Sequence, residues 1–178
     1  MNKLKNRIQG NIMPQILTPK HKIFTDISKA ADWRKKLRKN GRKLALTNGC
    51  FDILHRGHAE YLQAARNLGD ALIVLLNSDE SVRKLKGPAR PVNTEYDRAY
   101  LLASLACVDA VLIFNDTRCY REIAALQPDC YAKGGDYTVD TLNRDERTAL
   151  LNAGTEIAFI QFVPGLSTSN TIKKMKLG

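Results

Sequence analysis

Residues 44–58 read LALTNGCFDILHRGH, and this stretch decides the fold class. Residues 44–48 have the composition of a short strand that is buried on both faces. A turn containing Gly49 follows, and a segment with helical periodicity runs from Gly57 to Leu68. A buried strand that passes through a glycine-containing turn into a helix is the first unit of a parallel α/β sheet.

The alternation of strand and helix continues along the chain. We predict further strands at 71–77, 109–114, 130–133 and 156–163. Helices are predicted at 28–39, 57–68, 94–106, 118–126 and 145–153, with a last helix from Ser167. Strands that are apolar throughout need cover on both faces, which right-handed crossovers supply. The sequence therefore predicts an α/β fold: a Rossmann-like, doubly wound, parallel five-stranded sheet with helices on both faces.

The net charge of +10 is distributed unevenly over the 178 residues. Residues 1–45 carry 13 basic and 2 acidic side chains, whereas residues 46–178 carry 15 basic and 16 acidic ones. We expect a flexible basic tail at 1–24 and a single domain at 25–178, which starts with a basic helix at 25–41. A strong positive charge is typical of proteins that bind nucleic acid or membranes, but here it stops near Lys43.

The cysteines and the N-terminus bear on the compartment. Cys50, Cys107, Cys119 and Cys130 form no Cys-x-x-Cys pair, so neither a structural metal nor a disulfide framework is expected. Residues 1–17 lack the apolar core of a secretory signal, and no stretch approaches the roughly 20 apolar residues that cross a bilayer. We expect a cytoplasmic protein.

Two histidines mark the start of the predicted helix 57–68. His55 and His58 flank Gly57, and residues three apart on a helix share a face. The glycine leaves the backbone open to close approach, and the N–H groups of a helix N-terminus attract an anion. We interpret the pattern as a phosphate site with two imidazoles beside it. Two histidines at this spacing can also hold a metal ion.

The run from Thr47 to His58 resembles the His-x-Gly-His signature of the nucleotidyltransferase superfamily. Class I aminoacyl-tRNA synthetases share a related signature, but this chain is too short for one and lacks their second, lysine-rich loop. Within the superfamily the chain is most similar to heptose 1-phosphate adenylyltransferases, the nucleotidyl-transferring domain of ADP-heptose synthases. The similarity runs from about Ser28 to the C-terminus, and the blocks 86–93 and 133–137 point to this subfamily.

The resemblance implies transfer of AMP from ATP to heptose 1-phosphate, which gives ADP-heptose for lipopolysaccharide core synthesis and pyrophosphate. A phosphate nucleophile is already anionic, so the protein supplies alignment and charge compensation rather than a strong base. Mg²⁺ carried with ATP is the implied cofactor, with no metal ligands from the chain. The resemblance also implies a homodimer and a separate sugar kinase, with no nucleic-acid or membrane partner.

The resemblance assigns roles to individual residues. His55, His58 and Lys86 are the implied catalytic residues, with both imidazoles protonated beside a polyphosphate. The implied nucleotide-binding residues are Thr47, Asn48, Gly49, Cys50, Phe51, Asp52, Gly57, Arg90, Gly134, Asp136, Ser167, Thr168 and Ser169. The implied substrate-binding residues are Asn77, Asp79, Arg98, Lys133 and Tyr137.

Simpler interpretations remain open for several of these residues. A basic loop such as 86–90 is common on protein surfaces, Asp136 suits a turn, and Ser167 to Ser169 suit a helix N-cap. For the whole chain, one alternative is a CTP-dependent cytidylyltransferase acting on glycerol 3-phosphate or a similar small phosphate. Another is an RNA- or membrane-binding protein that acts through its basic N-terminus.

Overall fold

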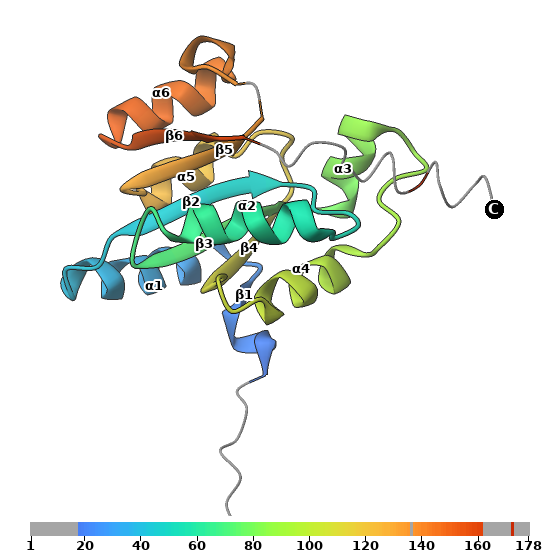
Figure 1. Ribbon diagram of the computed structural model, residues 1–178, viewed down its shortest axis with the longest axis horizontal. Coiled ribbons are helices and arrows are strands. Elements are labelled where there is room, and N and C mark those ends of the chain that lie inside the picture. Colours follow the sequence, from blue (N-terminus) through green and yellow to red (C-terminus); the bar gives the residue numbers. More distant parts are fainter. Residues whose placement is uncertain (1–17, 136, 162–171, 173–178) are drawn as a thin grey trace, which may run out of the picture.

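The computed structural model of the protein describes residues 18–135, 137–161 and 172. Within them, parallel strands form one six-stranded sheet in the order β1-β4-β3-β2-β5-β6 (Figure 1). Their bounds are β1 Ile23–Phe24, β2 Leu44–Gly49, β3 Ala71–Asn77, β4 Ala110–Phe114, β5 Cys130–Gly134 and β6 Glu156–Ile160. The predicted Rossmann-like α/β fold is confirmed.

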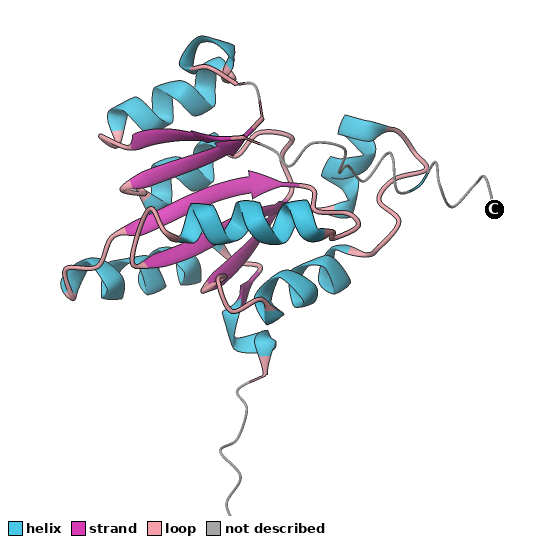
Figure 2. Ribbon diagram, viewed as in Figure 1, coloured by secondary structure: helices cyan, strands magenta, loops and turns pink. Residues whose placement is uncertain are grey.

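Helices connect the strands and cover both faces of the sheet (Figure 2). The helices are α1 Ile27–Lys39, α2 Arg56–Arg66, α3 Asp79–Lys86, α4 Glu95–Ser104, α5 Tyr120–Leu126 and α6 Arg144–Asn152, with single 3-10 turns at Pro19–Lys22 and Val139–Thr141. Side chains of α1, α5 and α6 join one hydrophobic core, and those of α2 and α4 join a second core on the other face. The doubly wound arrangement is thus also confirmed.

Strand β3 shows why the sequence pattern indicates a parallel sheet. All seven of its residues are buried. Ile73 and Leu75 pack into the core beneath α1 and α5, whereas Leu72 and Val74 pack into the core beneath α2 and α4. Because successive side chains point to opposite faces, burial of both faces requires an unbroken apolar run.

The strand count predicted from the sequence is wrong. The sheet has six described strands rather than five, because Ile23 and Phe24 pair with Val111 and Leu112 of β4. Both residues stand inside the predicted flexible tail 1–24, and a two-residue strand gives no periodic signal. Lys22 adds a hydrogen bond from its Nζ to the carbonyl of Val108, at 2.8 Å. The ordered fold therefore begins before residue 24, and residues 1–17 lie outside the described part.

Helix α1 confirms the predicted basic helix and shows that one of its cations is structural. Arg34 is 3% exposed and forms an ion pair of 2.7 Å with Asp129, which precedes β5. It also donates to the carbonyls of Leu126 and Gln127 at the end of α5. The arginine therefore fastens α1 to the sheet, and this part of the positive charge is not free to attract a partner.

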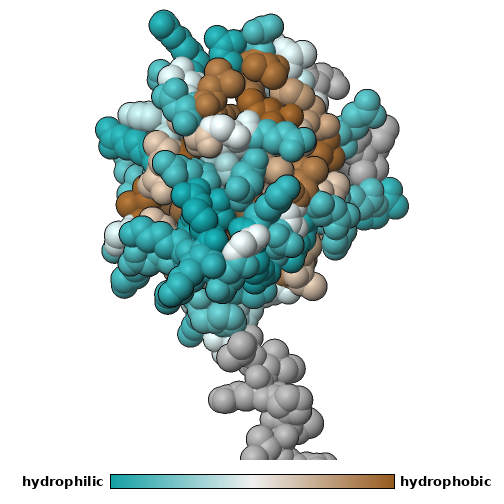
Figure 3. Space-filling view, turned by 90° about the vertical axis from the view of Figure 1, so that its left-hand side faces the viewer, coloured by the Kyte–Doolittle hydropathy of each residue, from teal (hydrophilic) through white to brown (hydrophobic). Residues whose placement is uncertain are grey.

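The end of the molecule seen in Figure 3 is mostly hydrophilic, with hydrophobic residues gathered toward the top, at the height of α6 and β6. Leu151 of α6 is 62% exposed. A hollow of about 740 Å³ lies between α5 and α6, with Arg144 and Asp145 among its lining. No histidine or lysine is among the described residues that line it, and these residues belong to helices and their ends rather than to strand ends. None of the described helices is long and apolar enough to span a membrane.

Candidate active site

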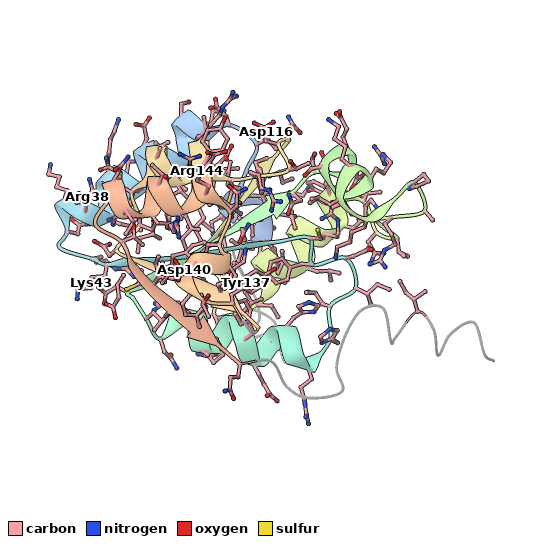
Figure 4. All side chains as sticks on the ribbon, turned by 90° about the horizontal axis from the view of Figure 1, so that it is seen from above. Arg38, Lys43, Asp116, Tyr137, Asp140 and Arg144 are labelled. Carbon is pink, nitrogen blue, oxygen red and sulfur yellow. The ribbon has the colours of Figure 1, made fainter. Side chains whose placement is uncertain are left out.

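A pocket of about 380 Å³ opens at the carboxyl ends of the central strands. It is lined by the loop after β2, the first turns of α2, the end of α3, the β4–α5 loop and the end of β5: Asn48, Gly49, Cys50, Phe51, Asp52, His58, Tyr61, Asn77, Leu85, Lys86, Thr117, Arg118, Lys133, Gly134 and Tyr137. In Figure 4, Tyr137 lies well away from Arg38 and Lys43, which lie where α1 ends and β2 begins. Ligands of doubly wound sheets bind at such carboxyl ends, where the strand order reverses.

The two signature histidines lie against each other at the start of α2. Their rings stack, with centroids 3.9 Å apart and planes at 26°. The backbone N–H of His55 donates to Nδ1 of His58 at 3.3 Å. Because that nitrogen accepts, the proton of a neutral His58 stands on Nε2. Nδ1 of His55 is buried and has no hydrogen-bond partner among the described residues, so the pair retains unused hydrogen-bonding capacity.

The protonation state of His58 follows from its surroundings. Burial, together with the nearby charges of His55 and Lys86, lowers the pKa of His58 to about 4. His58 is therefore neutral at pH 7 while the pocket holds no anion. Nε2–H of the neutral ring still donates, and a bound polyphosphate would raise the pKa, so protonation beside a polyphosphate stays a prediction.

The loop of residues 49–55 is shaped to support the histidines. Phe51 has a positive φ of 44°, a strained backbone for a residue with a side chain. Its ring centroid lies 5.3 Å from that of His58. A Cβ on Gly49 would lie 2.9 Å from Cε2 of Phe51, so any larger residue would have to displace the ring. Gly49 and Phe51 thus act together as a support behind His58.

Asp52 ties this loop to the basic loop at 87–93. Its side chain has no exposed surface, and it accepts from Nε of Arg90 at 2.5 Å and from the N–H of Val92 at 2.7 Å. Burial by itself would raise the pKa of Asp52, but the hydrogen bonds from Arg90, Asn93 and Val92 lower it overall. Arg90 is 17% exposed and lies outside the pocket lining, so it holds the loop in place rather than reaching freely for a phosphate.

Three residues expected to contact the substrate have protein partners. Arg98 is fully buried and donates to the carbonyls of Cys50 and Asn93 and to Oδ1 of Asp79, at 2.6, 3.1 and 2.8 Å. Asn77 is 4% exposed, and its amide donates to Oγ of Ser81 at 2.8 Å. Arg98 and Asp79 do not line the pocket. Arg98 and Asp79 thus join the loop after β2, the loop 87–93 and α3 behind the pocket.

The β5 side of the pocket carries a second polar group. Oδ1 of Asn48 accepts from the Tyr131 hydroxyl at 2.8 Å and from Nζ of Lys133 at 3.0 Å. Nζ of Lys133 also lies 5.3 Å from the ring centroid of Tyr137, within cation–π range. Gly135 has a φ of +106°, which a residue with a side chain rarely adopts.

Thr47 lies behind the pocket rather than in it. Its hydroxyl is 2.6 Å from that of Tyr61, which donates to the carbonyl of Ala132 at 3.0 Å. Burial raises the pKa of Tyr61 to about 12, so this hydroxyl keeps its proton. The contact links β2 to β5 across α2, and Thr47 serves the position of the strands.

The structure brings most of the expected residues to one pocket. Those that do not line it are Thr47, His55, Gly57, Asp79, Arg90 and Arg98. The expected residues Asp136, Ser167, Thr168 and Ser169 lie outside the described part of the chain. Residues that the sequence analysis missed are Tyr61, Leu85, Thr117 and Arg118. Thr117 and Arg118 follow a predicted strand, so the rule that strand ends face the ligand would have found them.

A metal site receives no support from the described residues, which contain no group of three or more His, Cys, Asp or Glu side chains able to hold an ion. Asp52 is the one carboxylate among the residues that line the pocket, and Arg90 pairs with it. The described residues therefore offer the histidine pair none of the further ligands that a metal would need.

Comparison with known proteins relates the chain to a family. The family model described as cytidylyltransferase-like matches residues 46–174. The bifunctional protein HldE of Aliarcobacter butzleri is 47% identical over 156 residues, which are 87% of this chain and 31% of that protein. HldE of Helicobacter pylori is 50% identical over 140 residues, or 79% of this chain and 29% of that protein. The chain thus spans less than a third of the length of these relatives.

Solved structures agree with the fold. The lipopolysaccharide core biosynthesis protein from Thermoplasma volcanium is 26% identical with a TM-score of 0.56, covering 69% of this chain and 98% of that one. A pantoate-beta-alanine ligase from Francisella tularensis is 16% identical with a TM-score of 0.52, covering 88% and 79%. The second likeness bears on the fold alone.

Proposed function

The chain belongs to the cytidylyltransferase-like family, and on that premise we propose that it transfers AMP from ATP to heptose 1-phosphate, giving ADP-heptose and pyrophosphate. The observation that carries the proposal is the stacked pair His55 and His58 at the start of α2, of which His58 lines the same pocket as Lys86. The relatives named HldE and the likeness to a lipopolysaccharide core biosynthesis protein support a sugar phosphate as the acceptor.

In the proposed reaction an oxygen of the sugar 1-phosphate forms a bond to the α-phosphorus of ATP. The bond from that phosphorus to the bridging oxygen breaks, and the electron pair leaves with pyrophosphate. Negative charge grows on the α-phosphate oxygens and on the bridging oxygen. Nε2–H of His58 donates to this charge, and His55 and the N–H groups that open α2 add to it. Lys86 neutralises the β- and γ-phosphates.

The nucleotide is proposed to occupy the β5 half of the pocket. There Asn48 and Lys133 form a preassembled polar pair, and Tyr137 offers an exposed ring. Lys133 and Tyr137, which the sequence analysis assigned to the acceptor substrate, are thus proposed to contact the nucleotide instead. Gly134 allows close approach of the backbone, and Asp136 and the segment 167–169 stay proposed contacts of the nucleotide. We further propose that Mg²⁺ arrives with ATP, because the pocket offers no free carboxylate among its described residues. The homodimer, the separate sugar kinase, the cytoplasmic location and the boundaries of the domain stay predictions.

A substrate panel tests the proposal directly. Pyrophosphate release is measured with ATP and with CTP, each against heptose 1-phosphate and glycerol 3-phosphate. We expect turnover with ATP and heptose 1-phosphate to exceed every other combination. Faster turnover with CTP and glycerol 3-phosphate would contradict the proposal and favour the cytidylyltransferase alternative. No turnover with any pair would exclude both.

A further inference from the structure

The β4–α5 loop places a cation in the pocket that the proposed mechanism leaves unused. Arg118 lines the pocket beside Thr117, and its side chain is exposed. It makes no hydrogen bond or ion pair with any described residue. Arg90 and Lys133 differ, since Asp52 holds Arg90 and Asn48 holds Lys133. An unpaired guanidinium that faces a pocket is available to an anionic ligand.

The backbone on both sides of Arg118 is fixed. The carbonyl of Asp116 accepts from Oγ of Ser81 at 2.8 Å, which ties the loop to α3. The N–H of Cys119 donates at 3.1 Å to Oε1 of Glu146, a residue of α6 that is 3% exposed. In Figure 4, Asp116 lies on the side of α3 and far from Lys43, which directly precedes β2. The loop therefore holds the backbone of Arg118 beside the pocket, while its guanidinium has no partner among the described residues.

The sheet order divides the pocket into two halves. Strand β5 lies on one side of β2, and β3 and β4 lie on the other. With the nucleotide in the β5 half, the acceptor takes the half at the ends of β3 and β4. That half is lined by Thr117 and Arg118, with Asn77 at its base. Arg118 is the one cation that the loops after β3 and β4 contribute to the described lining besides Lys86, which the mechanism assigns to ATP.

We propose that Arg118 binds the phosphate of the acceptor sugar 1-phosphate and so makes the site specific for a phosphorylated acceptor. This inference rests on the proposed function. A guanidinium presents parallel N–H donors that match two oxygens of a phosphate. Two such bonds leave the third oxygen directed at the α-phosphorus, so Arg118 also orients the nucleophile.

Steady-state kinetics of Arg118→Gln test the inference, with pyrophosphate release from ATP and heptose 1-phosphate as the readout. We expect KM for heptose 1-phosphate to rise about 10- to 100-fold, the loss that follows removal of charged hydrogen bonds. KM for ATP should change by less than about twofold, and the melting temperature should stay the same because Arg118 has no described protein partner. Arg118→Lys keeps the charge but loses the paired donors, so its KM for the acceptor should be intermediate.

Arg121→Gln is the matched control. Arg121 is exposed, lies outside the pocket lining and pairs with Asp116 at 3.7 Å, so both KM values should stay near those of the wild type. In an active wild type, a rise in KM for ATP alone, or no change in either KM of Arg118→Gln, overturns the role of Arg118 and leaves the proposed function standing. A wild type that releases no pyrophosphate from this pair refutes the proposed function, and the inference falls with it.

Discussion

Replacement of Asp52 by Asn should loosen the loop 87–93 without removing volume from the site. The buried carboxylate accepts from Nε of Arg90 and from the N–H groups of Val92 and Asn93. An asparagine retains one oxygen for the two backbone groups. It offers Arg90 no negative charge, and its own NH₂ group would face the guanidinium donor.

The expected loss can be worked from this geometry. Removing one partner of a fully buried ion pair costs about 3–5 kcal/mol of unfolding free energy. The Arg90 side chain is 17% exposed, and water can reach part of it. Because the backbone hydrogen bonds also persist, we expect a loss of about 2 kcal/mol. For a domain of this size that lowers the melting temperature by about 4–8 °C.

Urea denaturation followed by far-UV circular dichroism at pH 7 measures this loss. The folded-state pKa of Asp52 lies below the ordinary 3.8, so the ion pair stabilises the wild type above that pH and is lost as the pH falls through the folded value. The difference between wild type and Asp52→Asn should therefore shrink in acid. Asp116→Asn is the control, because its carboxylate is 55% exposed and its pair with Arg121 should contribute less than about 0.5 kcal/mol. Equal losses for the two variants would refute the role of Asp52 as a clamp.

Three further predictions concern the histidines and Gly49. His55→Ala and His58→Ala should each lower kcat about 100- to 1,000-fold with an unchanged circular dichroism spectrum, because each removes a transition-state donor. His21→Ala, at an exposed position, is the control. Near-normal pyrophosphate release by either variant would contradict the assignment. Lowering the pH from 6.5 toward 4 should destabilise the wild type, because His58 takes up a proton in the unfolded state but not in the folded state, where its pKa is about 4. The urea midpoint of His58→Gln should therefore fall less over this pH range. An equal fall for both proteins would show that His58 does not cause the destabilisation. Gly49→Ala should cost about 1–3 kcal/mol of unfolding free energy and lower turnover, because the new methyl group displaces the Phe51 ring from His58. Unchanged stability and turnover of this variant would show that the ring moves aside without cost.

Much of the fold was predictable because its signals are local. Each of the five longer strands contains a run of three to six apolar residues, which is typical of a buried strand in any α/β arrangement. Strand β1 is too short for a pattern. Helix α3 was missed although its start is marked by Ser78 as N-cap and by Asp79 and Glu80 in its first turn.

The site was predictable in outline but not in the division of labour among its charges. His55, Gly57 and His58 are close in sequence, so their joint role can be read directly. The burial of Arg98 depends on Cys50, 48 positions earlier, and that of Asp52 on Arg90, 38 positions later. No spacing rule distinguishes a charged side chain that holds a loop from one that binds a ligand, because the difference depends on whether the fold places an opposite charge beside it.

The two residues of β1 have a consequence for solubility. Strand β4 would otherwise form the border of the sheet and present the backbone groups of Val111 and Leu112 to any extended chain. Exposed borders of this kind template aggregation, and Ile23 and Phe24 occupy this one. The family match begins only at residue 46, so a chain shortened to that match would lose β1 along with α1. Residues that take no part in the chemistry thus keep neighbouring molecules from adding themselves to the sheet.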